Sequence, residues 1–574
     1  MRSSSALHCV AVTLLAATLA GAQDKPAASK APLKQVGGLR FVDVSEITIV
    51  NVEVSVRDRS GPVFGLSAAD FEVYQDGKLQ ALTNFYFFTS KREGAATTAA
   101  PAALPPPTPT LPTGTPIEPA PPREPRFLAV YLDNENMMPF NRNRILNQVI
   151  EFVEQRLQPS DKAMVVSYQR SLKILQPFTS DADEVASALR RTKRFVGARN
   201  EMLTSRRQIE DYISQNAENP ASIGRALDQV ESFAKEQRNN LTFTVRAIQE
   251  LVTMMSGLPG RKSIIYVSDG LPLSPGLELY YEMQDRYRNP MITTRARDYD
   301  STDLFRGLVT SAAAAGVRLY TIDARGLESD LGIEADNRQA RSSLAAGIAT
   351  SNYQDSLVYM ADQTGGLAVI NANNVGPGLE RIGDDIETYY SLGYRLIPTG
   401  EDRMHRIEVK LKGKQGYKLN YQKSFIEKSL PTRVADQVVS GLAFDLEDNP
   451  LAIEVSTGEP APAMAERWTL PVSVLVPMDK IALIPDGEDL IGWLMVYFAA
   501  RDSEGMQSDL QRLEHAIRIP AKGYDESKKQ HWTVSANLLL EPGTYRISVG
   551  VRDQLTNQAG FTVVRKPVHP ELRR

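Results

Sequence analysis

The middle of the chain alternates continuous apolar runs with helix-type patterns, and this alternation restricts the possible folds more than any other feature. Residues 127–132 carry no charge, as expected for a strand buried on both faces of a sheet. Similar runs recur at residues 163–168 and 263–267, and at residues 317–322 with Arg318 as their one charged residue, with amphipathic segments between them. Strands that alternate with helices form right-handed crossovers. The sequence therefore predicts an α/β fold with a mostly parallel sheet covered by helices on both faces.

The first 35 residues are predicted to lie outside any folded domain. Residues 1–22 begin with the basic Arg2, continue as a short apolar stretch and end in Ala20-Gly21-Ala22, which predicts a cleaved signal peptide. Export to the periplasm or the medium would follow, and an uncleaved N-terminal anchor is the alternative. Residues 23–35 are rich in Pro, Ala and Lys and are predicted to be disordered.

A small β module and a linker are predicted next. Residues 36–90 alternate apolar and polar positions as strands do, and Asp76-Gly77 predicts a hairpin turn because type I′ turns need positive φ. Residues 91–125 contain eleven prolines and few large apolar groups. This composition indicates an extended linker that ends a domain.

The α/β region is predicted to span residues 126–400, with a helical insertion at 199–256 in which charges of both signs alternate. Residues 401–430 return to a strand pattern, and we expect them to rejoin the N-terminal module in one sandwich. Residues 431–574 show alternating strands separated by turn signals, which predicts an immunoglobulin-like β-sandwich.

Composition excludes several functional classes. The formal net charge is −4, so a dominant basic field for nucleic acid is absent, and no apolar stretch is long enough to predict a membrane span. The single cysteine, Cys9, allows neither a disulfide framework nor a thiolate metal site. The five histidines are not at metal-ligand spacing, and no zinc-protease or esterase motif occurs. We therefore predict that the chain is not an enzyme.

Several motifs together carry a family resemblance. They are Asp70-Phe71-Glu72-Val73-Tyr74-Gln75-Asp76-Gly77, Gly260-Arg261-Lys262-Ser263 followed by Val267-Ser268-Asp269-Gly270, Tyr320-Thr321-Ile322-Asp323-Ala324-Arg325-Gly326, Thr364-Gly365-Gly366 and Tyr389-Tyr390-Ser391-Leu392-Gly393-Tyr394. Through them, residues 40–425 resemble von Willebrand factor A (VWA) domain proteins, and more narrowly the bacterial secreted proteins described as carrying a VWFA-related domain. The resemblance implies a doubly wound, Rossmann-like sheet flanked by β-sandwich modules.

The resemblance also implies a metal site, which this sequence alters. In the family, an Asp-x-Ser-x-Ser motif, a Thr and a later Asp hold a metal ion that binds the ligand. Asp133 and Asp269 match the two aspartates, but Glu135 and Met137 replace the two serines, and no matching Thr is evident in residues 199–245. The candidate metal ligands are therefore Asp133, Glu135 and Asp269.

The charge of this set predicts a degenerate site. Three carboxylates can hold Mg²⁺ or Ca²⁺ through oxygen, but they would neutralise the ion and weaken its attraction for an acidic ligand. Without a metal, their repulsion should raise at least one pKa. The alternatives are that Asn134 or Asn136 caps the following helix, or that Glu135 pairs with Arg142 or Arg144.

The strand ends suggest where a partner would bind. Asp133, Asp269 and Asp323 follow apolar strands, whose carboxyl ends form the ligand edge of open α/β sheets. We expect Asn134, Asn136 and Asp323 to line this binding rim, although Asp323 is better explained as a turn-former. The sequence predicts an exported protein that binds a protein partner in the cell envelope or outside the cell. Metal-dependent adhesion through Mg²⁺ or Ca²⁺ and a metal-assisted hydrolase are the alternatives.

Overall fold

The computed structural model describes residues 48–89, 125–327, 343–413, 416–464 and 467–568. The expected signal peptide, the segment 23–35 and nearly all of the linker therefore lie outside the described residues. The chain divides into two compact units. The larger unit comprises Ile49–Arg395 and Glu401–Lys428, and the smaller includes Leu396–Gly400 and Ser429–Arg574.

A six-stranded sheet forms the centre of the larger unit in the part of the chain that the structure describes. Its order is β10-β9-β8-β5-β6-β7, and all neighbours are parallel except β6 and β7. The strands are β5 (Arg126–Asp133), β6 (Lys162–Gln169), β7 (Ser171–Thr179), β8 (Arg261–Ser268), β9 (Val317–Asp323) and β10 (Ala368–Val369). The predicted α/β class is confirmed, because uncharged runs such as β5 are covered on both faces.

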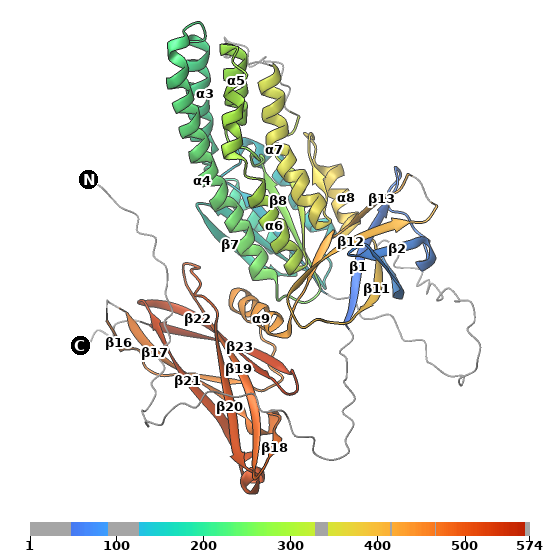
Figure 1. Ribbon diagram of the computed structural model, residues 1–574, viewed down its shortest axis with the longest axis vertical. Helices are drawn as coiled ribbons and strands as arrows, with labels where there is room; N and C mark the ends of the chain where they lie inside the picture. Colours follow the sequence, from blue (N-terminus) through green and yellow to red (C-terminus); the bar gives the residue numbers. More distant parts are fainter. Residues whose placement is uncertain (1–47, 90–124, 328–342, 414–415, 465–466, 569–574) are drawn as a thin grey trace. The chain divides into compact units, whose positions relative to one another are not determined.

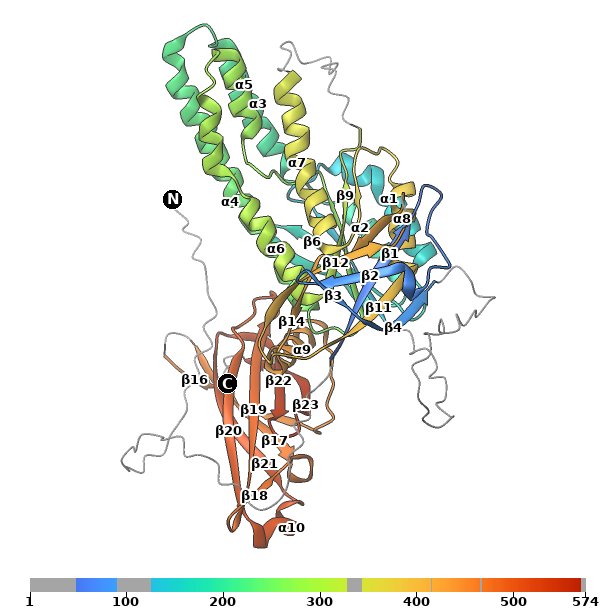
Figure 2. The ribbon, with the colours of Figure 1, turned by 45° about the vertical axis from the view of Figure 1, so that its right-hand side comes forward.

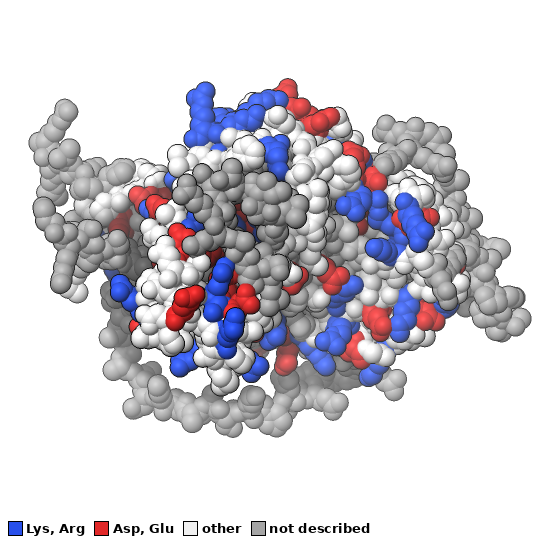
Figure 3. All heavy atoms as spheres, turned by 90° about the horizontal axis from the view of Figure 1, so that it is seen from above, with Lys and Arg blue, Asp and Glu red and all other residues white. Residues whose placement is uncertain are grey.

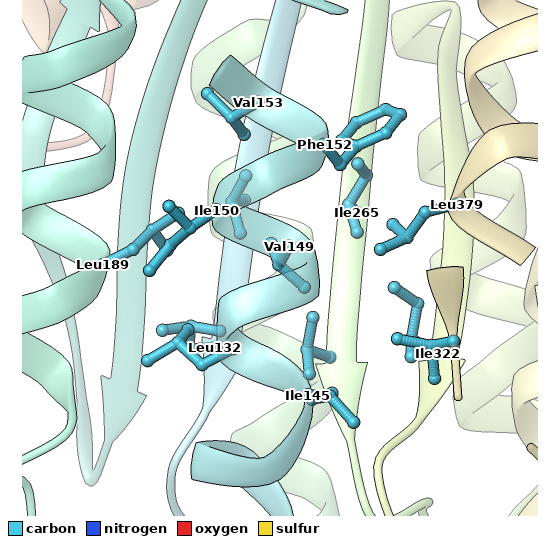
Figure 4. Packing of buried hydrophobic residues seen from close by; sticks show 14 of the residues in the cluster. Leu132, Ile145, Val149, Ile150, Phe152, Val153, Leu189, Ile265, Ile322 and Leu379 are labelled. Carbon is cyan, nitrogen blue, oxygen red and sulfur yellow. The ribbon is translucent and has the colours of Figure 1, made fainter. Parts of the chain in front are cut away.

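Helices cover both faces of this sheet. On one face lie α1 (Pro139–Arg156), α2 (Ala182–Thr192) and α8 (Gly376–Glu387). Figure 4 shows Ile145, Val149 and Phe152 of α1, which lies in front of the sheet, in one cluster with Leu132 and Ile265 of the strands. The other face carries α6 (Thr302–Ala315) and α7 (Ser343–Thr364), and α4 (Ile223–Met255) packs on α6. The apolar stripe of each helix accounts for this layering.

The insertion forms a helical extension with its own core. Its helices α3 (Arg199–Gln215) and the first half of α4 are joined by α5 (Leu277–Tyr287) from outside the insertion, and together these helices project beyond the carboxyl ends of the strands (Figures 1 and 2). Ile213, Val230, Phe233, Leu279 and Met283 pack between them. A 3₁₀ turn at Pro220–Ser222 separates α3 from α4.

The strands before and after the α/β core pair with one another. One sheet has the order β13-β1-β11-β4 and the other β14-β12-β2-β3. Their bounds are β1 (Thr48–Arg57), β2 (Phe71–Gln75), β3 (Lys78–Gln80), β4 (Leu82–Phe88), β11 (Tyr389–Leu396), β12 (Arg403–Leu411), β13 (Lys418–Tyr421) and β14 (Ser424–Glu427). Asp76 and Gly77 both have positive φ, as the predicted hairpin turn requires.

The smaller unit is a β-sandwich preceded by a helix. The sequence predicted only strands after residue 430, but α9 (Leu430–Phe444) is helical. Its Val434, Val438 and Leu442 follow a helical period and pack against Tyr497 and Phe561, and this period was missed within a region rich in strand patterns. The main strands are β15 (Glu454–Thr457), β17 (Trp468–Pro477), β19 (Asp489–Asp502), β20 (Gln511–Pro520), β21 (His531–Leu540), β22 (Gly543–Asp553) and β23 (Ala559–Val568).

Minor elements complete the smaller unit. They are β16 (Ala461–Pro462), β18 (Ile484–Asp486) and α10 (Tyr524–Ser527). Within the described ranges of the whole chain, the helices are too short or too polar to cross a bilayer.

Candidate functional site

Three aspartates lie at one edge of the central sheet. β9, β8 and β5 are neighbouring parallel strands, so their carboxyl ends share an edge. Asp133 ends β5, Asp323 ends β9, and Asp269 directly follows β8. We call this edge, with Asp133, Asp269 and Asp323, the rim. These three residues were predicted to lie at a common edge, and the parallel pairing of β5, β8 and β9 places them there.

Asp133 is fully buried and is surrounded by uncharged donors. Asn136 donates to it from its backbone N at 3.1 Å and from its side-chain Nδ2 at 3.0 and 3.1 Å. The hydroxyls of Tyr266 and Ser268 donate to Oδ2. Burial nevertheless outweighs these hydrogen bonds and raises the pKa of Asp133 to about 6. The carboxyl group of Asp133 is therefore held by neutral partners, and no cation offsets the effect of its burial.

Asp269 is also buried, but a cation faces it. Its Oδ2 accepts from the backbone N of Met138 at 2.8 Å and from Nδ2 of Asn141 at 3.0 Å. The Nε of Arg199 lies 3.7 Å from the same oxygen. The other oxygen, Oδ1, is buried without a hydrogen-bond partner. Burial raises the pKa of Asp269, whereas Arg199 lowers it.

Asp323 forms an ion pair with Arg325, which lies in the same turn. Its Oδ1 accepts from the backbone N of Arg325 at 3.0 Å, which is a turn-forming contact, and its Oδ2 lies 2.9 Å from the Arg325 guanidinium. Gln354 of α7 donates to the same Oδ2 at 2.9 Å. Asp323 is therefore occupied by contacts within the chain.

The other predicted rim residues have structural partners that differ from the expected ones. Asn134 accepts from Arg142 at 2.8 Å and donates to Ser167 at 2.6 Å. Asn136 joins Asp133 to Thr244 of α4, 3.0 Å away. Neither asparagine caps α1, whose N-cap is Met138 without a side-chain hydrogen bond. The capping alternative was therefore wrong.

Glu135 does not form the expected ion pair. Arg142 hydrogen-bonds Asn134 and two backbone carbonyls, whereas Arg144 bonds Asn373 and the carbonyl of Ala324. The Oε2 of Glu135 is buried without a hydrogen-bond partner. The expected pairing of Glu135 with Arg142 or Arg144 was therefore wrong.

Sequence reasoning missed Arg199 and Thr244. Both belong to the insertion, where alternating charges indicated a solvated helical face. Arg199 is only 6% exposed and Thr244 is fully buried. The apolar residues Leu241, Val245 and Ile248 place Thr244 on the buried side of α4, and this was the signal available in the sequence.

The donor set does not fit a divalent ion. Among the described residues, no group of three His, Cys, Asp or Glu side chains is arranged to hold a metal ion. Both oxygens of Asp133 already accept hydrogen bonds, and Met137 is buried in the apolar cluster beneath α1. The set Asp133, Glu135 and Asp269 therefore remains a prediction that the geometry does not favour. The pKa of two rim acids rises as expected, but burial rather than mutual repulsion is the main cause.

The rim is not an accessible surface. Asp133, Asn134 and Asp269 are 0% exposed, and Asp323 is 1% exposed. The loop before α3 covers this edge, where Gly197 approaches so closely that a Cβ would lie 2.6 Å from the carbonyl oxygen of Met137. A partner therefore cannot reach Asp133, Asn134, Asp269 or Asp323 in this conformation, whereas Asn136 is partly exposed.

A pocket lies at the opposite edge of the sheet and is lined by three arginines. Arg126 pairs with Asp161, and Arg156 lies 2.9 Å from Glu387. Arg261 lies 2.8 Å from Glu53. Because each guanidinium has a carboxylate partner within the chain, the pocket does not offer an unneutralised cation to a ligand.

Comparison with known proteins gives structural likeness alone. No family model matches the chain, and no curated protein matches it. Among solved structures, the vWF domain of the type V pili tip protein Mfa5 from Porphyromonas gingivalis is similar at 13% identity, covering 46% of this chain and 95% of that one with a TM-score of 0.26. A von Willebrand factor type A protein from Catenulispora acidiphila matches at 9% identity, covering 77% of this chain and 65% of that one with a TM-score of 0.21.

A third neighbour is the conserved hypothetical protein BatB from Bacteroides thetaiotaomicron. It is 12% identical, and the match covers 46% of this chain and 97% of that one with a TM-score of 0.21. The structural neighbours thus include VWA domains. These identities and TM-scores are too low to transfer a ligand or an activity to this chain.

Proposed function

We propose that this chain is an exported, non-enzymatic interaction protein of adhesion type, secreted or periplasmic, which binds a protein partner through its larger unit. The proposed scaffold is a doubly wound VWA-type sheet with a degenerate metal site. The strand order supports the doubly wound assignment, because the chain runs outward from β5 to β7 and then returns to build β8 to β10 on the other side.

The burial of the rim acids is the observation that carries this proposal. Metal-dependent adhesion needs an open cation, and hydrolysis needs an acid or base within reach of a substrate. Asp133 and Asp269 are 0% exposed and hydrogen-bonded within the chain. The arrangement supports binding through surrounding surface residues over chemistry at the rim.

Exposed apolar side chains beside the covered rim suggest the contact surface. Phe140 on α1 and Val196 before α3 are each 74% exposed. They flank the close contact between Gly197 and the segment Met137–Pro139. Contiguous exposed apolar patches rimmed by polar residues are typical of protein interfaces. On the face shown in Figure 3, acidic and basic side chains are interspersed, so no single-sign field indicates nucleic acid as the partner.

Site-specific cross-linking in the organism that makes the protein tests this proposal. A benzophenone amino acid replaces Phe140 in the full-length chain, and a matched chain carries it at Phe243, which is 54% exposed on α4. We expect a discrete protein adduct from position 140, and a weaker one or none from position 243. The adduct should persist in EDTA.

Three results would contradict the proposal in different ways. Absence of any adduct from position 140 would remove the proposed surface. An adduct that EDTA abolishes would favour metal-dependent adhesion. Turnover of the cross-linked partner that disappears in Asp269→Asn would favour the hydrolase. Circular dichroism of both labelled chains checks that the substitutions leave the fold intact.

A further inference from the structure

The rim contains a positive charge that the chain itself supplies. Arg199 is the first residue of α3 and is only 6% exposed. Its Nε lies 3.7 Å from Oδ2 of Asp269, and its Nη1 donates to the carbonyl oxygen of Asn136 at 2.8 Å. The same carbonyl accepts from the backbone N of Asp269 at 3.3 Å. The guanidinium is therefore fixed between the segments that follow β5 and β8.

A buried aromatic ring holds the guanidinium from a further side. Tyr353 of α7 is 3% exposed, and its ring centre lies 5.2 Å from the guanidinium carbon of Arg199 and 5.8 Å from that of Arg325. Arg325 pairs with Asp323, as Arg199 pairs with Asp269. The two aspartates thus each have a guanidinium, and one ring contacts both cations.

Buried carboxylates need a counter-charge, because an unpaired ionised group is costly to bury. A divalent ion would meet this need, but the donor set does not fit one, since both oxygens of Asp133 accept hydrogen bonds and Met137 is buried in the core. Arg199 supplies the counter-charge through its ion pair with Asp269, and it is held there by a hydrogen bond to the carbonyl of Asn136 and by the ring of Tyr353. No open coordination position is required.

We infer that the guanidinium of Arg199 is the resident cation of this rim: it takes the electrostatic place of a divalent ion and pins the helical extension to the sheet without metal. Because α3 begins at Arg199, the same side chain that neutralises Asp269 also holds the insertion over the strand ends. The inference concerns the chain's own charges and stands independently of the proposed partner.

A set of charge variants tests this inference in the full mature chain. Arg199→Met keeps side-chain length and removes the charge, Arg199→Lys keeps the charge, and Arg246→Met removes an exposed arginine from α4 as a matched control. We expect Arg199→Met to lower the melting temperature of the larger unit by roughly 10 °C, since it leaves Asp269 buried and unpaired. Arg199→Lys should lower the melting temperature by less than half as much as Arg199→Met. Arg246→Met should melt within about 2 °C of the wild type.

A double variant separates charge pairing from packing. If Arg199 acts as the counter-charge, Asp269→Asn should raise the melting temperature of Arg199→Met, because the neutral pair leaves no buried ion. If Arg199 acts only by filling space, Asp269→Asn will lower the melting temperature of Arg199→Met further, and the inference is overturned. Should Arg199→Met fail to fold, recovery of folding in the double variant gives the same answer.

Metal addition provides the second test. The melting temperature of the wild type should be unchanged by millimolar MgCl₂, CaCl₂ or MnCl₂ and by EDTA. A rise of several degrees with any of these salts, lost in Asp269→Asn, would show that the rim takes a divalent ion and would overturn the inference. Melting of Arg199→Met within about 2 °C of Arg246→Met would overturn it as well.

Discussion

The two edges of the central sheet neutralise their buried charges to different extents. At the amino edge, Arg318 of β9 lies 3.1 Å from Glu53 and 3.7 Å from Asp385, and Glu53 is also 2.8 Å from Arg261. At the carboxyl edge, Asp133 has only neutral donors. We call the amino-edge network of Arg318, Glu53, Asp385 and Arg261 the joint, because Glu53 belongs to β1 of the β module.

The difference shows what each edge is built to do. At the joint, the guanidinium of Arg318 faces two carboxylates, and the negative charges raise its pKa despite burial. Charge there supports the attachment of the β module to the core. At the rim, burial raises the pKa of Asp133 and Asp269, so negative charge there is costly. The carboxyl edge, where a binding site was predicted, therefore has its buried charges less well neutralised than the amino edge.

Removal of the joint cation should have the largest effect on stability. Arg318→Met leaves Glu53 and Asp385 without this partner, and the loss of one member of a buried pair costs about 3–5 kcal/mol. We expect the free energy of unfolding of the larger unit to fall by this amount in urea denaturation. Arg246→Met, in an exposed part of α4, is the control and should change it by less than about 0.5 kcal/mol. A loss at Arg318 smaller than that at Arg199 would reverse the comparison between the edges.

The pH dependence of Asp133 gives the next largest effect. Because its pKa is about 6 in the fold and 3.8 as the ordinary value, the folded chain binds more protons than the unfolded chain between these values. This group therefore lowers stability as pH rises from about 4 to 6, by up to about 3 kcal/mol, and the cost persists above pH 6. The difference in unfolding free energy between wild type and Asp133→Asn should show this slope.

A carboxylate with the opposite shift supplies the control for that measurement. The hydroxyl and backbone N of Thr302 donate to Asp300 and lower its pKa. Its contribution is present above the ordinary pKa of 3.8 and is lost as pH falls below it, so Asp300→Asn should give a nearly flat difference between pH 4 and 6 and a slope of opposite sign below about pH 4. A flat difference for Asp133→Asn between pH 4 and 6 would show that its carboxyl group is not strained by burial.

The link from the insertion to Asn136 should give the smallest effect. Thr244→Val keeps the shape but removes the hydroxyl that accepts from Asn136 at 3.0 Å. Asn136 keeps its bonds to Asp133, so we expect a loss of about 1 kcal/mol in unfolding free energy. Thr253→Val on the exposed side of α4 removes a comparable hydroxyl and should lower the unfolding free energy by less than half as much. Equal losses would mean that the rim gains nothing from Thr244.

The alternation of strands with helices and the shared edge of the three aspartates were accessible from sequence because both follow from local patterns. Predominantly apolar runs mark strands buried on both faces, and an aspartate at the end of such a run lies at the carboxyl edge. The hairpin at Asp76 was predicted because its backbone needs positive φ. Helix α9 was missed because its period lies within a region of alternating strands.

Sequence alone thus determined the alternation of elements, the β module on either side of the core, and the placement of Asp133, Asp269 and Asp323 at one edge. The tertiary structure alone decided that this edge is covered. Burial and ion pairing depend on groups far apart in the chain, and the pairing of Arg199 with Asp269 joins residues that no local pattern relates. A row of charges on a helix appears the same in sequence whether it faces water or a buried carboxylate, and only the packing of the helix on the sheet distinguishes the two.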